Sequence, residues 1–101
     1  MILPPHSCRT MPELRVQIDV LDTEIIALLQ KRAGYIARAA EIKQSEGLPA
    51  RISWRVEEVL AKARDNAAKV GLDPDLAETL WREMIEWSIR KEAATLEKEA
   101  T

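Results

Sequence analysis

The sequence predicts an all-α fold with three helices, of which the first is unusually long. Ala, Glu, Leu, Arg and Lys dominate the composition, and all of them favour helix. Glycine occurs only three times, and no segment alternates between apolar and polar residues as a strand does. The Leu, Ile, Val and Ala residues recur instead at helical spacing. We therefore expect one helical domain over residues 11–97, an irregular leader over 1–10 and a short tail over 98–101.

The first helix is expected from Thr10 or Met11 to about Gln44. Its apolar residues recur every three or four positions, as in a heptad: Leu14, Ile18, Leu21, Ile25 and Leu28. A helix of this length extends over about 50 Å, and two short helices cannot cover its apolar row. A second copy of the same chain is the simplest partner.

Gly47 and Pro49 predict the end of this helix, with Ser53 as N-cap of the next. The second helix is expected over residues 54–70, with Gly71 just past its end. Its predicted apolar stripe is Val56, Val59, Leu60, Ala63 and Ala67.

Asp73 is the predicted cap of the third helix and Pro74 its first residue. This helix is expected to continue to about Glu97. Its predicted inward stripe ends in two polar residues: Leu76, Leu80, Trp81, Met84, Ile85, Ser88 and Glu92.

Composition also argues against several classes of protein. The net charge is −2, which does not favour a nucleic-acid or membrane-surface partner. No apolar run has the roughly 20 residues that span a bilayer. The single cysteine, Cys8, has no internal partner, which favours a cytoplasmic protein. No Ser-His-Asp set, phosphate loop or metal-spaced cluster is present, so we expect no metal and no cofactor.

A set of cations is the candidate site. Continuing the heptad past Leu28 places Arg32 in the apolar row, and Lys43 follows eleven residues later, about three turns on and on the same side. Arg15 lies on that side too, but about 25 Å before Arg32, so only an antiparallel second copy would bring it close. Arg55 can approach from the start of the second helix. Such cations suit a small dicarboxylate, because arginine binds carboxylates through two parallel hydrogen bonds.

Simpler explanations exist for each charge. Charged residues of a long helix usually form a solvated face, and a single Arg in an apolar row can fix the register of a helical dimer. Glu92 near a C-terminus is most often exposed. The joint pattern of cations along one row and an acid on another helix's inner face favours a binding site.

Two segments carry a resemblance to a known family: LRVQIDVLDTEIIALLQKR, which is the more specific, and GLDPDLAETLWREMIEWSIRKE. Together with Lys43 and Arg55 between them, they resemble the all-helical class of chorismate mutases over about residues 12–96. The resemblance implies an intertwined homodimer with two active sites, each lined by both chains. It also implies a cofactor-free reaction of aromatic amino acid biosynthesis, the Claisen rearrangement of chorismate to prephenate.

Carried over to this sequence, the family's site residues have distinct roles. Arg15 would come from the partner chain and hold one substrate carboxylate, and Arg32 would bind the other. Lys43 would contact a carboxylate and the ether oxygen. Arg55 would support the site, Ser88 would line it, and Glu92 would replace a glutamine that hydrogen-bonds the breaking ether linkage. The resemblance thus assigns catalysis to Arg32, Lys43 and Glu92.

Three positions depart from the family pattern. Val56 replaces a glutamate that binds the substrate's ring hydroxyl, Ile52 replaces a frequent acid, and Glu92 replaces the glutamine. The first two, together with Cys8, Tyr35, SEGLPA and IEW, are similar to a sibling with the same fold, isochorismate pyruvate lyase, which forms salicylate. A non-catalytic helical dimerisation module is the remaining alternative.

Overall fold

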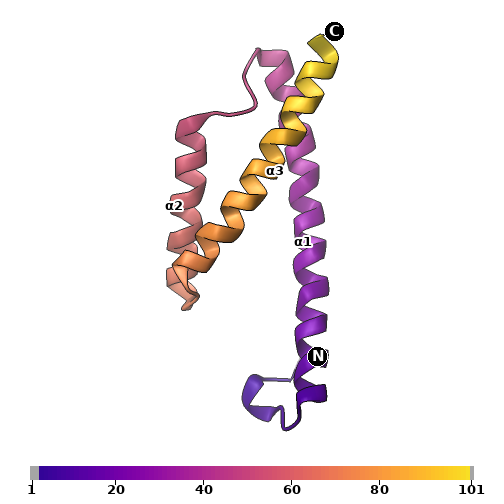
Figure 1. The fold of residues 1–101 in the computed structure, drawn as a ribbon, viewed down its shortest axis with the longest axis vertical. Helices are drawn as coiled ribbons and strands as arrows, with labels where there is room; N and C mark the ends of the chain where they lie inside the picture. Colours follow the sequence, from indigo (N-terminus) through magenta and orange to yellow (C-terminus); the bar gives the residue numbers. More distant parts are fainter. Residues whose placement is uncertain (1–2, 101) are drawn as a thin grey trace. The chain divides into compact units, whose positions relative to one another are not determined.

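The computed structural model describes residues 3–100, and the side chains of residues 3–96. It confirms the all-α class: three α-helices follow a short 3-10 helix, η1, at Pro5–Ser7. The α-helices are α1 at Met11–Glu46, α2 at Ser53–Val70 and α3 at Pro74–Ala100 (Figure 1). The chain divides into two compact units, residues 1–35 and 36–101, and α1 contributes to both.

The predicted helix boundaries need small corrections. Helix α1 starts at Met11 as expected but runs two residues past Gln44 to Glu46. Ser53 is not a cap; it is the first residue of α2, and the N-cap is Ile52. The Ile52 carbonyl accepts the first main-chain hydrogen bonds, from the N–H groups of Arg55 and Val56. Helix α3 continues through Ala100, beyond the predicted end at Glu97.

The turn between α2 and α3 follows the predicted capping residues. Gly71 has a φ of 79°, the left-handed conformation of a helix C-cap, and the N–H of Leu72 bonds the Ala67 carbonyl at 2.9 Å. Asp73 then accepts the N–H of Asp75 on Oδ1 at 2.9 Å, as an N-cap does. The chain reverses direction at this turn, so α2 and α3 both extend to the same side of it (Figure 1).

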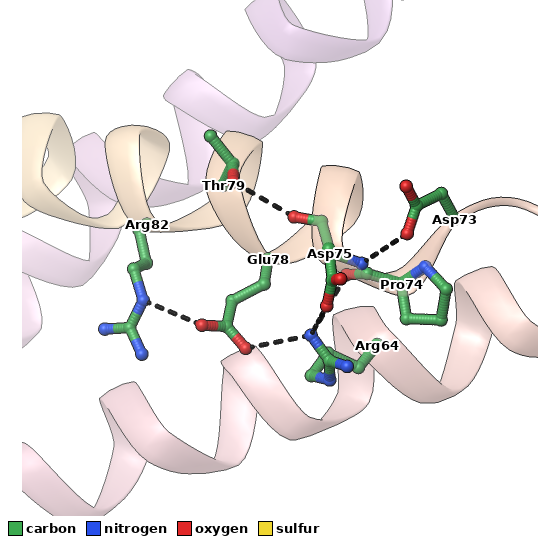
Figure 2. Close-up of polar contacts among 7 residues, drawn as sticks. All are labelled: Arg64, Asp73, Pro74, Asp75, Glu78, Thr79 and Arg82. Carbon is green, nitrogen blue, oxygen red and sulfur yellow. Dashed lines mark hydrogen bonds and ion pairs between the residues drawn. The ribbon is translucent and has the colours of Figure 1, made fainter.

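A cluster of charged side chains stabilises the same turn (Figure 2). Arg64 of α2 donates to the carboxylates of Asp75 and Glu78 on α3, at 2.9 and 3.1 Å. The other oxygen of Glu78 accepts from Arg82. The hydrogen bond to Asp75 and the nearby acidic charges raise the pKa of Arg64. The cluster therefore joins the start of α3 to the second half of α2.

Among residues 3–96, whose burial is described, all the buried ones lie in the second unit. Three of the five residues in the predicted α2 stripe are buried, namely Leu60, Ala63 and Ala67, and Val56 and Val59 are half-buried. On α3 the predicted stripe is wrong only at its start, where Leu76 and Leu80 are exposed and Ala77 is buried instead. Its later members are buried or half-buried as expected: Trp81, Met84, Ile85, Ser88 and Glu92. Steps of three or four residues lead from Ala77 to Trp81, Ile85 and Ser88, which places Ala77 on the buried face.

The described part of the first unit has no buried residue. Its apolar side chains on α1 are 40–66% exposed: Val16, Ile18, Val20, Leu21, Ile25, Ile26, Leu28 and Leu29. Leu14 is half-buried. No helix in the described chain has the length and hydropathy that crossing a membrane requires.

Candidate functional site

The structure joins two of the predicted site residues directly. The Lys43 ammonium, on the last turns of α1, donates to Oε2 of Glu92 on α3 at 2.7 Å. The Glu92 side chain is 5% exposed and that of Lys43 is 18% exposed. An acid near a C-terminus is usually solvated, but this one is buried beside its only described cationic partner. Glu92 therefore lies in the interior of the second unit, which agrees with its place in the predicted inward stripe.

A main-chain oxygen is the second acceptor for Lys43. Its ammonium also donates to the carbonyl of Ala50, at 2.7 Å. Charge-assisted bonds of this length are strong, and an ammonium has three N–H donors. Among the described contacts two of those donors are used, so one N–H is left to meet a ligand.

Ser88 lies one helical turn before Glu92 on α3 and is also buried. Its hydroxyl donates to the Met84 carbonyl at 2.8 Å, as a serine inside a helix often does. Ser88 and Glu92 thus place two oxygens on the buried face of α3, in the unit that contains Lys43.

The other predicted cations have different environments. Arg55 is exposed at the start of α2 and pairs with Glu58 on its own helix, so the described contacts do not bring it to Lys43 or Glu92. Arg15 is exposed and Arg32 is half-buried, both on the part of α1 that belongs to the first unit. The predicted role of Arg15 requires a second chain.

The two apolar replacements are both half-buried. Ile52 is the N-cap of α2 and makes no side-chain hydrogen bond to the helix, and Val56 follows one turn later. Neither side chain can accept a hydrogen bond from a ligand hydroxyl. The start of α2 is therefore apolar at these two positions.

Sequence reasoning missed an ion pair beside the Ala50 carbonyl. Arg51 donates to Glu86 of α3 at 2.6 Å, and both side chains are about half exposed. This hydrogen bond is the main cause that lowers the pKa of Glu86 and raises that of Arg51; the charge of Arg90 also lowers the Glu86 value. No sequence signal relates a loop residue to an acid 35 positions later.

The chemistry that Lys43, Ser88 and Glu92 offer is that of charge and hydrogen bonds. Among the described residues no group of three or more His, Cys, Asp or Glu side chains could hold a metal ion. Lysine, serine and glutamate instead offer hydrogen bonds and charge. Such groups can orient an anionic ligand and stabilise negative charge that develops on it.

Comparison with known proteins gives a family match and several relatives. A sequence model of the family described as chorismate mutase type II matches residues 14–93. The chain is 37% identical to the T-protein of Enterobacter agglomerans over 79 residues, which are 78% of this chain and 21% of that protein. It is 33% identical to the T-protein of Haemophilus influenzae over 82 residues, 81% of this chain and 22% of that protein. The chain thus spans about a fifth of each T-protein.

A third relative is similar in length to this chain. The chain is 30% identical to the isochorismate pyruvate lyase of Pseudomonas aeruginosa over 91 residues. These residues are 87% of this chain and 86% of the lyase.

Proposed function

Because the chain belongs to the chorismate mutase type II family, we propose that it is a chorismate mutase, which rearranges chorismate to prephenate without a cofactor. The observation that carries the proposal is the Lys43 ammonium, half-buried and held by Ala50 and Glu92, with one N–H left for a ligand among the described contacts. A lysine held in this way can donate to the ether oxygen, on which negative charge grows as the C–O bond breaks.

The remaining roles follow from charge. Arg32 binds one carboxylate of the substrate and an Arg15 from a second chain binds the other, because the planar guanidinium matches a carboxylate. Holding both carboxylates brings the enolpyruvyl side chain over the ring, which is the geometry the rearrangement needs. Ser88 and Arg55 support the bound substrate. We place this reaction in the cytoplasm, in agreement with a single cysteine that forms no internal disulfide.

The proposal includes a homodimer. The apolar row of α1 repeats as in a coiled coil, and its described residues before Tyr35 are not buried within the chain. Helices in proteins gain most of their stability by packing an apolar face, so this row needs a partner. A second α1 offers the same row in return and supplies Arg15.

Isochorismate pyruvate lyase activity is the second candidate. Two observations favour it: the similarity to the Pseudomonas lyase over most of both chains, and the apolar Val56 and Ile52. Neither residue can hydrogen-bond the ring hydroxyl that a mutase of this family must accommodate. The lyase would release pyruvate from isochorismate and leave salicylate.

One experiment decides between these activities. The pure protein is incubated separately with chorismate and with isochorismate, and prephenate and salicylate are measured in each reaction. We expect prephenate from chorismate at a rate that Lys43→Ala lowers by at least about 100-fold. The matched control is Lys62→Ala, which removes an exposed lysine of α2. Salicylate as the dominant product would replace the mutase with the lyase.

The non-catalytic alternative makes the opposite predictions. A dimerisation module would convert neither substrate, and Arg32→Leu would raise its melting temperature by relieving a charge in the apolar row. In an enzyme, Arg32→Ala abolishes turnover and leaves the fold intact. A dicarboxylate analogue of chorismate would raise the melting temperature of the enzyme only.

A further inference from the structure

The segment between α1 and α2 is held at its ends by its own backbone. At the α1 end, Gly47 has a φ of 68° and the N–H of Leu48 bonds the Lys43 carbonyl at 2.8 Å. At the α2 end, the Ile52 carbonyl accepts from Arg55 and Val56. The described contacts of the middle residues, Ala50 and Arg51, are of a different kind, because each involves a side chain from a helix.

These two contacts act on one peptide unit. The carbonyl of Ala50 and the nitrogen of Arg51 share a planar peptide group. Lys43 bonds the oxygen of that group, and the Arg51 side chain is bound to Glu86. The plane that directs the Ala50 oxygen toward Lys43 is thus tied, through the residue that follows it, to α3.

We propose that Arg51, through its ion pair with Glu86, is a positioning residue for Lys43. The ion pair fixes the peptide group whose oxygen takes one of the lysine's three N–H donors. Glu92 takes the second, and together the two acceptors determine the direction of the third. The effect of Arg51 on turnover rests on the proposed function. The effect of Arg51 on the position of the Lys43 ammonium does not.

Glu86 is available to bind Arg51 because Lys43 pairs with a different acid of α3. Glu86 and Glu92 are six residues apart on that helix, and each binds a different cation: Glu86 binds Arg51 and Glu92 binds Lys43. The Lys43 pair is buried, and the Arg51 pair is half exposed. An exposed ion pair contributes little to global stability, so loss of Arg51 should alter the direction of the ammonium rather than the fold.

The first arm of the test measures turnover of whichever substrate the wild type converts. We expect Arg51→Ala and Glu86→Gln each to lower kcat about tenfold, with KM changed less than threefold, because small displacements of a catalytic group are costly. The exchanged pair, Arg51→Glu with Glu86→Arg, should recover most of the loss. The matched control is Arg82→Ala, which removes another arginine paired with an acid of α3.

The second arm measures Lys43 itself and needs no activity. Reductive methylation by formaldehyde and cyanoborohydride, read by peptide mass spectrometry, reports how readily the ammonium leaves its acceptors. We expect Lys43 to react several-fold faster in Arg51→Ala and Glu86→Gln than in wild type or Arg82→Ala, and to be protected again in the exchanged pair.

The two arms separate the two proposals. A wild type that converts neither substrate but shows the expected labelling pattern would overturn the proposed function and retain the positioning role. Unchanged Lys43 labelling in Arg51→Ala and Glu86→Gln would overturn the positioning role, whatever the activity. A kcat within twofold of wild type in both variants would also overturn it. If Arg51→Ala fails to fold, Glu86→Gln and the exchanged pair still give both readings.

Discussion

At the scale of single residues, the ion pair of Lys43 and Glu92 is the central feature of the molecule. Desolvating two charges is costly, and their attraction offsets the cost only when geometry is good and further hydrogen bonds are present. The Ala50 carbonyl supplies such a bond. We therefore expect the free energy of unfolding to fall less when both charges are removed than when only one is removed.

This expectation can be tested by a double-mutant cycle. Lys43→Met leaves a buried carboxylate without its cation, so we expect it to lower the free energy of unfolding by about 3 kcal/mol. The double variant Lys43→Met with Glu92→Gln should lose clearly less. Urea unfolding measures both. Arg38→Met, which breaks an exposed pair with Glu41, is the control and should change stability by about 0.5 kcal/mol or less. Additive single effects at positions 43 and 92 would contradict the coupling.

The charge at position 92 is the second prediction at this scale. An ionised carboxylate beside the ether oxygen would repel the negative charge that develops there, whereas an amide can donate a hydrogen bond to it and still accept one from Lys43. We therefore expect Glu92→Gln to raise kcat/KM for chorismate. Glu83→Gln, at an exposed position of α3, should leave kcat/KM unchanged. A kcat/KM for Glu92→Gln below that of wild type would exclude this role for Glu92.

At the scale of the helices and their connections, Gly71, Asp73 and Pro74 determine where α2 ends and α3 begins. Gly71, Asp73 and Pro74 were predicted as the turn from their types and order alone, and the structure confirms all three. The start of α2 was predicted one residue late, because Ser53 is a better cap by type than Ile52. The Ile52 carbonyl determines the helix start there, and that is a backbone property without a sequence signature.

Substituting Gly71 tests the turn. The φ of 79° is unfavourable for a residue with a Cβ, so Gly71→Ala should lower the free energy of unfolding by about 1 kcal/mol. Gly34→Ala is the matched control, because Gly34 lies inside α1 and an added Cβ meets no atom within 4 Å. Alanine there should stabilise the helix by up to about 1 kcal/mol. Chemical unfolding of both variants should give effects of opposite sign.

The ion pair of Glu86 with Arg51 predicts a pH dependence of stability. A carboxyl whose pKa is lowered in the folded state stabilises the fold above its unfolded pKa, about 4.3 for glutamate. That contribution is lost as pH falls through the lowered folded-state pKa. Glu86→Gln should therefore melt slightly below wild type at pH 7, and the two should converge near pH 3. Equal melting temperatures at pH 7 would contradict the prediction; Glu83→Gln is the control.

At the scale of the whole molecule, the sequence predicted what depends on periodicity and residue type. The helical class, the three helices, the α2 stripe and the inward position of Glu92 all follow from spacing along the chain. The Lys43 contact with Ala50 and the Arg51 pair with Glu86 could not be predicted, because they depend on the path of a nonhelical segment. The α3 stripe was wrong by one position at Leu76 and Leu80, where small Ala77 is buried in their place.

The proposed homodimer makes a prediction at the same scale. If a second α1 covers the apolar row, the melting temperature should rise with protein concentration, and sedimentation should give twice the chain mass. Leu28→Glu introduces a charge in the row and should yield a monomer of lower stability. Gln30→Glu, an exposed residue outside the row, is the control. A wild type that sediments as a single chain would exclude both the homodimer and the predicted role of Arg15.

The second acceptor of Lys43 is an atom that every amino acid possesses. Since the bond is made to a main-chain oxygen seven residues downstream, replacing Ala50 leaves the acceptor present. Inserting or deleting one residue between these positions, however, would place a different carbonyl opposite the ammonium. The side chain at position 50 is therefore expected to be free to vary, whereas the number of residues between Lys43 and position 50 should be strict.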